Sequence, residues 1–573
     1  MKRKQIIRII SMALTICALL ATAACNPKAS EGSPSPGGSG TSASPGTSQT
    51  VPGGNSAGTT AMGNPIVTFP LAEEATFEFM IRDYGVDTAK MAENNKFWQD
   101  MYEKTNVKVT WTTLGADPTA TLNAMFQSGR AGDCLPGSNI LNDANIALFS
   151  ASGMLMPIEK YVEDPEIMPI FHDRVLAYSP TTLGKMFAPD GHIYAMVQYN
   201  AYEPTYLESP LAINKVWLDN LGLAVPTTID QLHEVLVAFK NNDCNGNGNP
   251  NDEIPLLFCN GDTGYTHMEA LMYSWGIATK DSSLDSYVVI ENGKAKLAPM
   301  LDAWKDAVGT LGQWYGEGLV WSEAFTWNED TWWGIMTNDV PLVGVASGEI
   351  IDTPYASEYI YMTPPAAAGY TPVVYMNPGV NGAKNCFVLT KDCKNPEILM
   401  AWLDLFYELD TGLANYYNYP GEGRIELTAD GKYNILSVPS DQSTALSESN
   451  PHMREISGFS NMAINPDDYA NKMVLSSAQV AKGVVYDTYK SAGILNKNIW
   501  PRPYFDTDDA TRIAELRTDI FNIVATNRAK WGSGQGDINA EWNGFIESLN
   551  KAGVEEFVGI MQKAYDVYVQ GMS

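Results

Sequence analysis

Residues 211–240 read LAINKVWLDNLGLAVPTTIDQLHEVLVAFK, a short apolar segment followed by a polar turn and an amphipathic stretch. Thr227 or Thr228 is a suitable N-cap for a helix, because its hydroxyl can accept a hydrogen bond from the first turn. The apolar residues after it recur at helical spacing and form one face: Leu232, Val235, Leu236 and Phe239. This stretch therefore predicts a helix that packs on a core.

Strands and helices also alternate nearer the N-terminus. Alternating apolar residues predict strands over 75–80 and 107–111, with helices over 95–104 and 118–128. Strand, helix and strand in short succession indicate an α/β sheet. The C-terminus carries apolar stripes at helical spacing, which predict core helices: Trp542, Phe545, Ile546 and Leu549, then Phe557, Ile560, Met561 and Ala564.

Length and charge narrow the class of protein. The chain has 573 residues, 45% of them hydrophobic, which predicts two or more domains. It carries 37 Lys and Arg against 66 Asp and Glu, and residues 66–573 alone have a formal charge of −33. Nucleic acids and anionic membranes are held by clustered cations, so we expect neither as a partner.

The first 25 residues resemble a bacterial lipoprotein signal. A basic start precedes an apolar segment from Ile9 to Leu20, which is too short to span a membrane. The small residues before Cys25 then predict cleavage and diacylglyceryl attachment at Cys25, although Thr22 stands where lipoboxes usually have Leu. Plain secretion after an Ala-x-Ala site is the alternative.

Residues 26–65 predict a disordered spacer, because 28 of the 40 are Ser, Thr, Gly or Pro. No later segment is long and apolar enough to predict a transmembrane helix. We therefore expect a globular domain on the outer face of the cell membrane, held only by its lipid.

Two cysteine pairs are close enough in sequence to form disulfides, Cys244 with Cys259 and Cys386 with Cys393.

Catalytic signatures are absent. The sequence contains no GxSxG, HExxH, GxxxxGK[ST] or GxGxxG motif, and its five histidines lack metal-like spacing. A pair of carboxylates for glycoside hydrolysis stays open, because 65 acids are available and no spacing selects two of them.

Several segments resemble the extracellular solute-binding proteins of family 1, the LplA-like lipoproteins that serve carbohydrate ABC importers. They are GMLMPIEKY at 153–161, NKVWLDNLGLAVPT at 214–227 and NPEI at 395–398. A departure is AGDCLPG at 131–137, where relatives usually read Gly-Asp-x-Pro-Asp. The resemblance implies an α/β type II periplasmic-binding-protein fold, with two lobes, mixed sheets and a helix-rich C-terminus.

The resemblance also implies that the chain crosses between its lobes more than once. We expect residues 66–200 and 330–385 in the first lobe, and residues 201–329 and 386–573 in the second. The ligand is expected between the lobes, where closure on it can be sensed by a membrane partner.

Residues 243–253 read DCNGNGNPNDE and predict a calcium site, because calcium binds several oxygens from a flexible loop. Ile254 stands where an EF-hand has its bidentate Glu, so the loop is only EF-hand-like. Relatives carry a similar loop, and some bind calcium there. The expected ligands are Asp243, Asn245, Asn247, Asn249, Asp252 and Glu253. The alternative is a turn rich in Asn and Gly.

Sugars are recognised by aromatic rings and planar polar groups, which selects the candidates for the ligand site. A cluster of tryptophans spans 321–333, and three polar or aromatic residues follow the first predicted strand, where α/β clefts open. The candidates are Arg82, Asp83, Tyr84, Tyr199, Trp275, Trp327, Trp332 and Trp333.

Together with these observations, the family resemblance implies a monomeric, lipid-anchored receptor that delivers a carbohydrate, expected to be an oligosaccharide, to an ABC permease without bond chemistry. Two other functions stay open: an extracellular carbohydrate-active enzyme such as a glycosidase, and a binding module that signals the presence of a sugar.

Overall fold

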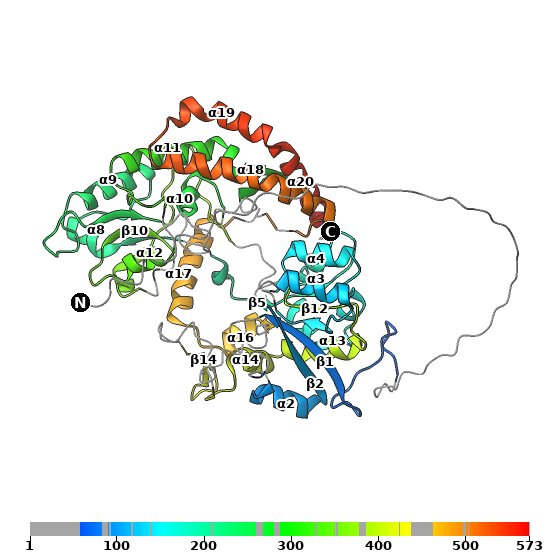
Figure 1. Ribbon diagram of the computed structural model, residues 1–573. Helices are drawn as coiled ribbons and strands as arrows, with labels where there is room; N and C mark the ends of the chain where they lie inside the picture. Colours follow the sequence, from blue (N-terminus) through cyan, green and yellow to red (C-terminus); the bar gives the residue numbers. More distant parts are fainter. Residues whose placement is uncertain are drawn as a thin grey trace, which may run out of the picture. The chain divides into compact units, whose positions relative to one another are not determined.

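The computed structural model describes residues 58–82, 90, 93–115, 118–137, 140–207, 210–258, 268–279, 287–326, 329–348, 350, 353–376, 385–422, 424–436, 462–496, 500–501 and 503–571 (Figure 1). The signal, Cys25 and most of the predicted spacer lie outside these residues. Residues 54–573 form one compact unit. Within the described residues, no helix combines the length and the apolarity that crossing a bilayer requires.

The first lobe is built on a mixed five-stranded sheet of order β2-β1-β3-β12-β4. β1 is parallel to β2 and β3, whereas β12 is antiparallel to β3 and β4. The strands are β1 Ala75–Arg82, β2 Val107–Leu114, β3 Cys134–Leu135, β12 Phe387–Leu389 and β4 Ala195–Met196. Its helices are α2 Lys96–Thr105, α3 Pro118–Ser128, α4 Asp143–Ala151, α5 Glu159–Val162, α6 Pro169–Phe171, α7 Thr182–Met186, α13 Pro396–Asp404, α14 Leu409–Tyr417 and α16 Pro466–Asn471.

The second lobe is built on a four-stranded sheet of order β11-β6-β10-β7. β10 is parallel to β7 and antiparallel to β6, which is also antiparallel to β11. The strands are β11 Tyr359–Tyr361, β6 Leu211–Asn214, β10 Val343–Ser347 and β7 Ile254–Leu257. Its helices are α8 Lys215–Leu221, α9 Ile229–Lys240, α10 Glu269–Met272, α11 Asp302–Gly316, α12 Glu329–Met336, α17 Ser477–Ala492, α18 Thr507–Gly532, α19 Ile538–Lys551 and α20 Val554–Gly571.

Small two-stranded sheets complete the structure. β13 Ile425–Leu427 pairs with β14 Tyr433–Ile435, β15 Ala463–Ile464 with β5 Tyr199–Asn200, and β8 Val288–Glu291 with β9 Lys294–Leu297. Each of the two larger sheets therefore takes its strands from separate segments of the chain.

Helix α9 forms as its sequence predicts. The Thr228 hydroxyl caps it by accepting a hydrogen bond from the Gln231 amide at 3.2 Å. The apolar face of the helix is buried, and Phe239 packs edge-on against Trp217 of α8. Trp304 of α11 stacks on Phe545 of α19 and contacts Trp531 of α18, so these helices share one core. Figure 1 shows the three helices side by side.

The strand pairing does not follow the expected lobe boundaries after residue 329. β10 and β11, from the segment 330–385, pair with the second lobe's strands, and β12, from the segment 386–573, pairs with the first lobe's. Helix α13 also packs in the first lobe's core, beside β1. Pairing over such long sequence separations leaves no local signal, so the two segments were assigned to the wrong sheets.

The end of the predicted spacer is also folded. The Thr60 hydroxyl and the Asn64 side-chain amide both donate to Asp164 Oδ2, at 2.5 and 2.8 Å, and both residues are buried. The Ala61 amide donates to Glu166 at 2.8 Å. Residues 58–65 therefore belong to the first lobe, and the expectation of disorder up to residue 65 is wrong for them, because two short polar side chains find a buried carboxylate.

The cysteines differ from the expected pairings. Cys134, Cys244, Cys386 and Cys393 are buried and form no disulfide, and Cys259 lies outside the described residues. Burial raises the pKa of Cys244 and of Cys393 to about 12, which keeps both in the unreactive thiol form.

Candidate functional site

The candidates after the first strand fall partly outside the described residues. Arg82 is the last residue of β1 and is exposed, whereas Asp83 and Tyr84 lie outside the described residues. Tyr199 is a core residue of the first lobe, in the short strand β5. Burial leaves little of its ring for a ligand.

The tryptophan cluster is divided between the core and the surface. Trp332 is 0% exposed and packs on the second sheet, with Ile254 and Val343 among its neighbours. Trp333 is half-buried, and its ring stands edge-on to that of Trp332 with the centroids 4.9 Å apart. Trp327 lies outside the described residues. Of the three, Trp333 offers a described surface on which a sugar could stack.

Trp275 lies in the second lobe's core at the end of a short helical segment, and its ring lines a cavity. None of the other candidates lines that cavity within the described residues. The structure therefore does not gather the sequence-selected aromatic residues into one described site, and their role in ligand binding stays a prediction.

The loop 243–253 is organised around carboxylate and amide oxygens. The Asp243 carboxylate accepts hydrogen bonds from the amides of Asn247 and Gly248, at 3.1 and 2.9 Å. Asn245 Oδ1 also accepts from the Asn247 amide at 3.0 Å. Gly246 and Gly248 have φ of 72° and 86°, a left-handed conformation that glycine adopts without strain. The loop thus turns its backbone amides toward Asp243.

Two further carboxylates close the loop. Asp252 accepts from the Asn247 side-chain amide at 2.7 Å, and Glu253 Oε1 accepts from the Cys244 amide at 2.8 Å. Glu253 Oε2 is buried and has no hydrogen-bond partner. Burial raises the pKa of Glu253, and the neighbouring charge of Asp252 adds to the rise. A buried carboxylate oxygen without a partner is costly, and a bound cation would remove that cost.

The donor set therefore fits calcium in its chemistry, because carboxylate and amide oxygens converge on one loop. Three of the six expected calcium ligands are asparagines, so the carboxylates alone do not make up the site. Among the described residues, no group of three or more His, Cys, Asp or Glu side chains is placed to hold a metal ion by itself.

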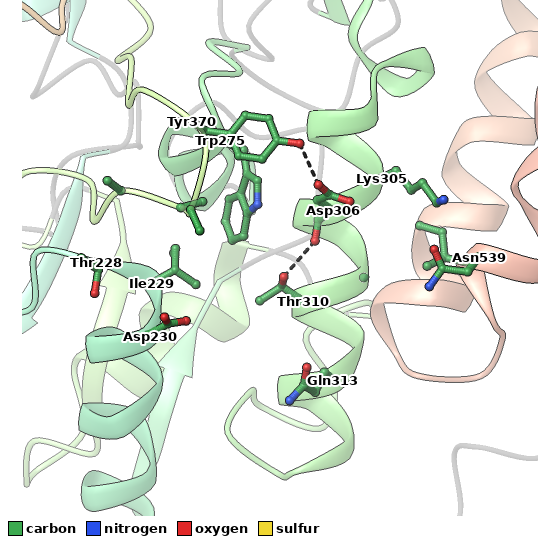
Figure 2. A pocket seen from close by; sticks show the side chains of 15 residues that line it. Thr228, Ile229, Asp230, Trp275, Lys305, Asp306, Thr310, Gln313, Tyr370 and Asn539 are labelled. Atoms are coloured by element: carbon green, nitrogen blue, oxygen red, sulfur yellow. Dashed lines mark hydrogen bonds between the residues drawn. The ribbon is translucent and has the colours of Figure 1, made fainter.

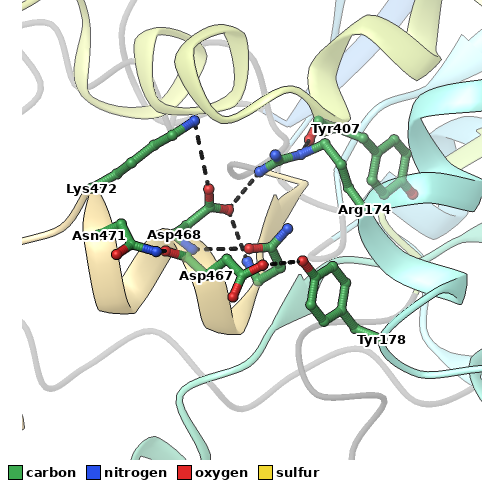
Figure 3. Close-up of polar contacts among 8 residues, drawn as sticks. Arg174, Tyr178, Tyr407, Asp467, Asp468, Asn471 and Lys472 are labelled. Atoms are coloured by element: carbon green, nitrogen blue, oxygen red, sulfur yellow. Dashed lines mark hydrogen bonds and ion pairs between the residues drawn. The ribbon is translucent and has the colours of Figure 1, made fainter.

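A buried ion pair between Arg174 and Asp468, which the sequence did not indicate, links residues 462–473 to the rest of the first lobe (Figure 3). Arg174 Nη2 lies 2.5 Å from Asp468 Oδ2, and Arg174 Nε donates to the Tyr407 carbonyl at 2.6 Å. Asp468 also accepts from the Asn465 amide as part of a capping box. Arg174 and Asp468 are 294 residues apart in the sequence, a separation over which no spacing pattern can indicate the pair.

The comparisons with known proteins agree with this architecture. A family model described as bacterial extracellular solute-binding protein matches residues 85–409, more than half of the chain. The chain belongs to this family. FusA of Streptococcus pneumoniae, a fructooligosaccharide ABC transporter substrate-binding protein, is 28% identical over 519 residues, which cover 88% of this solute-binding protein and 92% of FusA.

Solved structures carry the same fold. FusA in complex with kestose has a TM-score of 0.67 at 25% identity, covering 86% of this solute-binding protein and 99% of FusA. An extracellular solute-binding protein from Bifidobacterium longum subsp. infantis has a TM-score of 0.72 at 23% identity, and the match covers 89% of this chain and 99% of the Bifidobacterium chain. A FusA EF-hand mutant in complex with fructo-nystose has a TM-score of 0.68 at 24% identity, and the match covers 86% of this chain and 99% of the FusA chain. The two-lobed α/β fold expected from the sequence is confirmed.

Proposed function

We propose that this solute-binding protein is a lipid-anchored extracellular receptor that captures an oligosaccharide between its lobes and delivers it to an ABC permease. The observation that carries the proposal is the likeness to FusA, which extends over both lobes and over 92% of FusA. FusA is a fructooligosaccharide-binding protein and has been solved with kestose, so a fructose-containing oligosaccharide is the first ligand to test.

The mechanism is capture without bond chemistry. An exposed aromatic ring stacks on the C–H face of a sugar, and planar polar groups bind its hydroxyls. Of the described candidates, Trp333 and Arg82 are accessible for these two roles. Asp83, Tyr84 and Trp327 complete the proposed set, together with the more deeply buried Tyr199 and Trp332. Trp275, the remaining candidate from the sequence, lines a cavity that none of the other described candidates reaches, so it is left out of this set.

Trp333→Ala tests the stacking role, and its affinity for kestose is expected to fall at least tenfold. A tenfold loss corresponds to about 1.4 kcal/mol, a modest share of what a buried aromatic contact contributes. Tyr102→Ala removes another partly exposed ring, on α2 of the first lobe, and is the matched control. Isothermal titration calorimetry measures both variants, and equal affinities would remove Trp333 from the site.

We also propose that calcium binds the loop 243–253 in a structural role. The cation would be held by Asp243, Asn245, Asn247, the Asn249 carbonyl, Asp252 and Glu253, and its charge would relieve the repulsion among the three carboxylates. The unpartnered Glu253 oxygen supports this, and so does the existence of an EF-hand mutant among the FusA structures.

Chelation of calcium is expected to lower the melting temperature, and added calcium to restore it. At a free concentration of a hundred times the dissociation constant, binding stabilises the folded protein by about 2.7 kcal/mol. Asp243→Ala is expected to lose this response. Asp430→Ala changes an Asp in another surface turn and is expected to keep it. A melting temperature that is insensitive to chelator in the unsubstituted protein would contradict the proposal.

We propose that Cys25 carries the lipid that anchors the receptor. The anchor positions the receptor at the membrane that holds the permease, and the glycine- and serine-rich residues before position 58 supply its reach. In the bacterial host, Cys25→Ser is expected to move the protein from the membrane fraction to the medium. Retention in the membrane fraction would show that another segment attaches it.

A further inference from the structure

The second lobe contains a cavity of about 570 Å³ that the receptor function does not use (Figure 2). Its walls are the first turns of α9 and α19, one face of α11, Trp275 and residues 366–370. All five belong to the second lobe's core, so the cavity does not depend on lobe closure. Its volume is within the range of roughly 300–1,000 Å³ that is usual for small-molecule sites.

Trp275 is the buried group that points to a ligand. The residue is only 4% exposed, yet its indole N–H has no hydrogen-bond partner in the described part of the chain. Figure 2 shows the indole nitrogen on the edge of the ring that faces α11 across the cavity. This nitrogen is not among the fully enclosed polar atoms that lack a partner, so its N–H is open to the cavity and can donate to water or to a ligand there.

Acceptors and donors face this N–H around the cavity. Asp306 lies on α11, and its Oδ2 accepts from the Tyr370 hydroxyl at 2.7 Å, which fixes the carboxylate beside the tyrosine ring. That hydrogen bond, together with burial, raises the pKa of Tyr370 to about 12 and keeps the phenol protonated as the donor. Asp230 and Asn539 stand at the starts of α9 and α19.

The balance of charge selects the class of ligand. Asp230 and Asp306 line the cavity with a single cation, Lys305, so phosphate and carboxylate ligands are disfavoured. Hydroxyl groups both donate and accept, which suits a wall of carboxylates, an amide and an indole N–H. The partly exposed ring of Tyr370 adds an apolar surface for C–H groups.

We propose that this cavity is a second binding site, for a neutral polyhydroxylated small molecule such as a monosaccharide or sugar alcohol. The Trp275 N–H donates to one hydroxyl of the ligand, and the Asp306 carboxylate accepts from a neighbouring hydroxyl. The site is built entirely by the second lobe and is separate from the proposed oligosaccharide site, so either one can fail without the other.

The test uses nuclear magnetic resonance of the tryptophan indoles in the mature receptor. The Trp275 signal is assigned by its loss in Trp275→Phe, which removes the N–H and keeps an aromatic ring in the core. Titration with fructose, glucose and mannitol at millimolar concentrations is expected to shift this signal with at least one of them. The shift is expected to persist in Trp333→Ala and in the presence of kestose, whether or not kestose binds.

A second variant keeps the proposal falsifiable if Trp275→Phe is unstable. Asp306→Asn changes an exposed side chain and is expected to weaken binding at least tenfold, whereas Asp302→Asn, on the same helix but outside the cavity, is expected to leave binding unchanged. A Trp275 signal that none of the three compounds shifts would overturn the proposal. A shift with inorganic phosphate alone would overturn the assignment of a neutral ligand.

Discussion

Asp468→Ala is expected to lower the free energy of unfolding by about 3–5 kcal/mol, because it leaves the Arg174 guanidinium buried without its counter-charge. The two side chains are 3% and 11% exposed, and Arg174 Nη2 lies 2.5 Å from the carboxylate. Asp468 also accepts from the Asn465 amide, so the substitution removes a helix cap as well. Because α16 and β15 are held to the first lobe through these contacts, the whole segment 462–473 should loosen.

Denaturant unfolding measures the loss, and hydrogen exchange in 462–473 locates it. Asp467→Ala is the matched control, since Asp467 is the preceding residue but is exposed, and among the described groups its carboxylate accepts only from the Tyr178 hydroxyl (Figure 3). Its cost is expected to stay below about 1 kcal/mol, as for other surface contacts. Equal losses in the two variants would show that the buried ion pair does not fasten this segment.

Trp402→Ala is expected to cost about 3–5 kcal/mol, because it leaves a large cavity in the first lobe's core. Trp402 is fully buried on α13, and its ring contacts Phe79 of β1, Trp98 of α2 and Phe406, with centroids 5.8, 6.0 and 4.7 Å away. The substitution thus removes a side chain that joins a late segment of the chain to the first strand.

A double-mutant cycle distinguishes this contact from general destabilisation. Trp402→Ala combined with Phe79→Ala is expected to show a coupling energy of about 0.5–3 kcal/mol, since the rings touch. Combined with Trp304→Ala, in the second lobe's core, the effects are expected to add within about 0.5 kcal/mol. If the effects of Trp402→Ala and Phe79→Ala were additive, the two rings would not be coupled, and α13 would lie outside the first lobe's core.

Local features of this fold were predictable from sequence because they depend on residues a few positions apart. The Thr228 cap and the apolar face of α9 lie within one short segment, and the structure has both. The EF-hand-like loop likewise shows its acceptors and its two left-handed glycines in eleven residues. Neighbouring residues determine these conformations, so the sequence pattern is sufficient.

Sheet membership was not predictable in the same way. β12 pairs with β3, which lies more than 250 residues earlier, and β10, which is buried along its whole length as β12 is, pairs in the other lobe. Hydrophobicity alone cannot choose between two sheets that both need buried strands. The same limit explains why residues 58–65 were predicted to be disordered. Thr60 and Asn64 are held by hydrogen bonds to Asp164, which lies about a hundred residues later in the sequence.

The candidate site was predictable only in part, for a related reason. A pair of adjacent tryptophans at 332 and 333 indicates that one ring faces away from the core, and the structure has Trp333 as the more exposed. Whether Trp332 or Trp333 faces the core depends on which side of helix α12 packs against the sheet, and the sequence does not determine that side. The cavity at Trp275 has no sequence motif, because its walls come from five separate segments.

The central claim is that this receptor binds an oligosaccharide and does not cleave it. Calorimetric titration of kestose into the mature protein, followed by chromatography of the recovered sugar, tests both parts at once. The account predicts saturable binding of one kestose per chain and recovery of intact kestose. Release of fructose or sucrose would contradict it in favour of a carbohydrate-active enzyme, and the absence of binding to kestose and to longer oligosaccharides would contradict the receptor function itself.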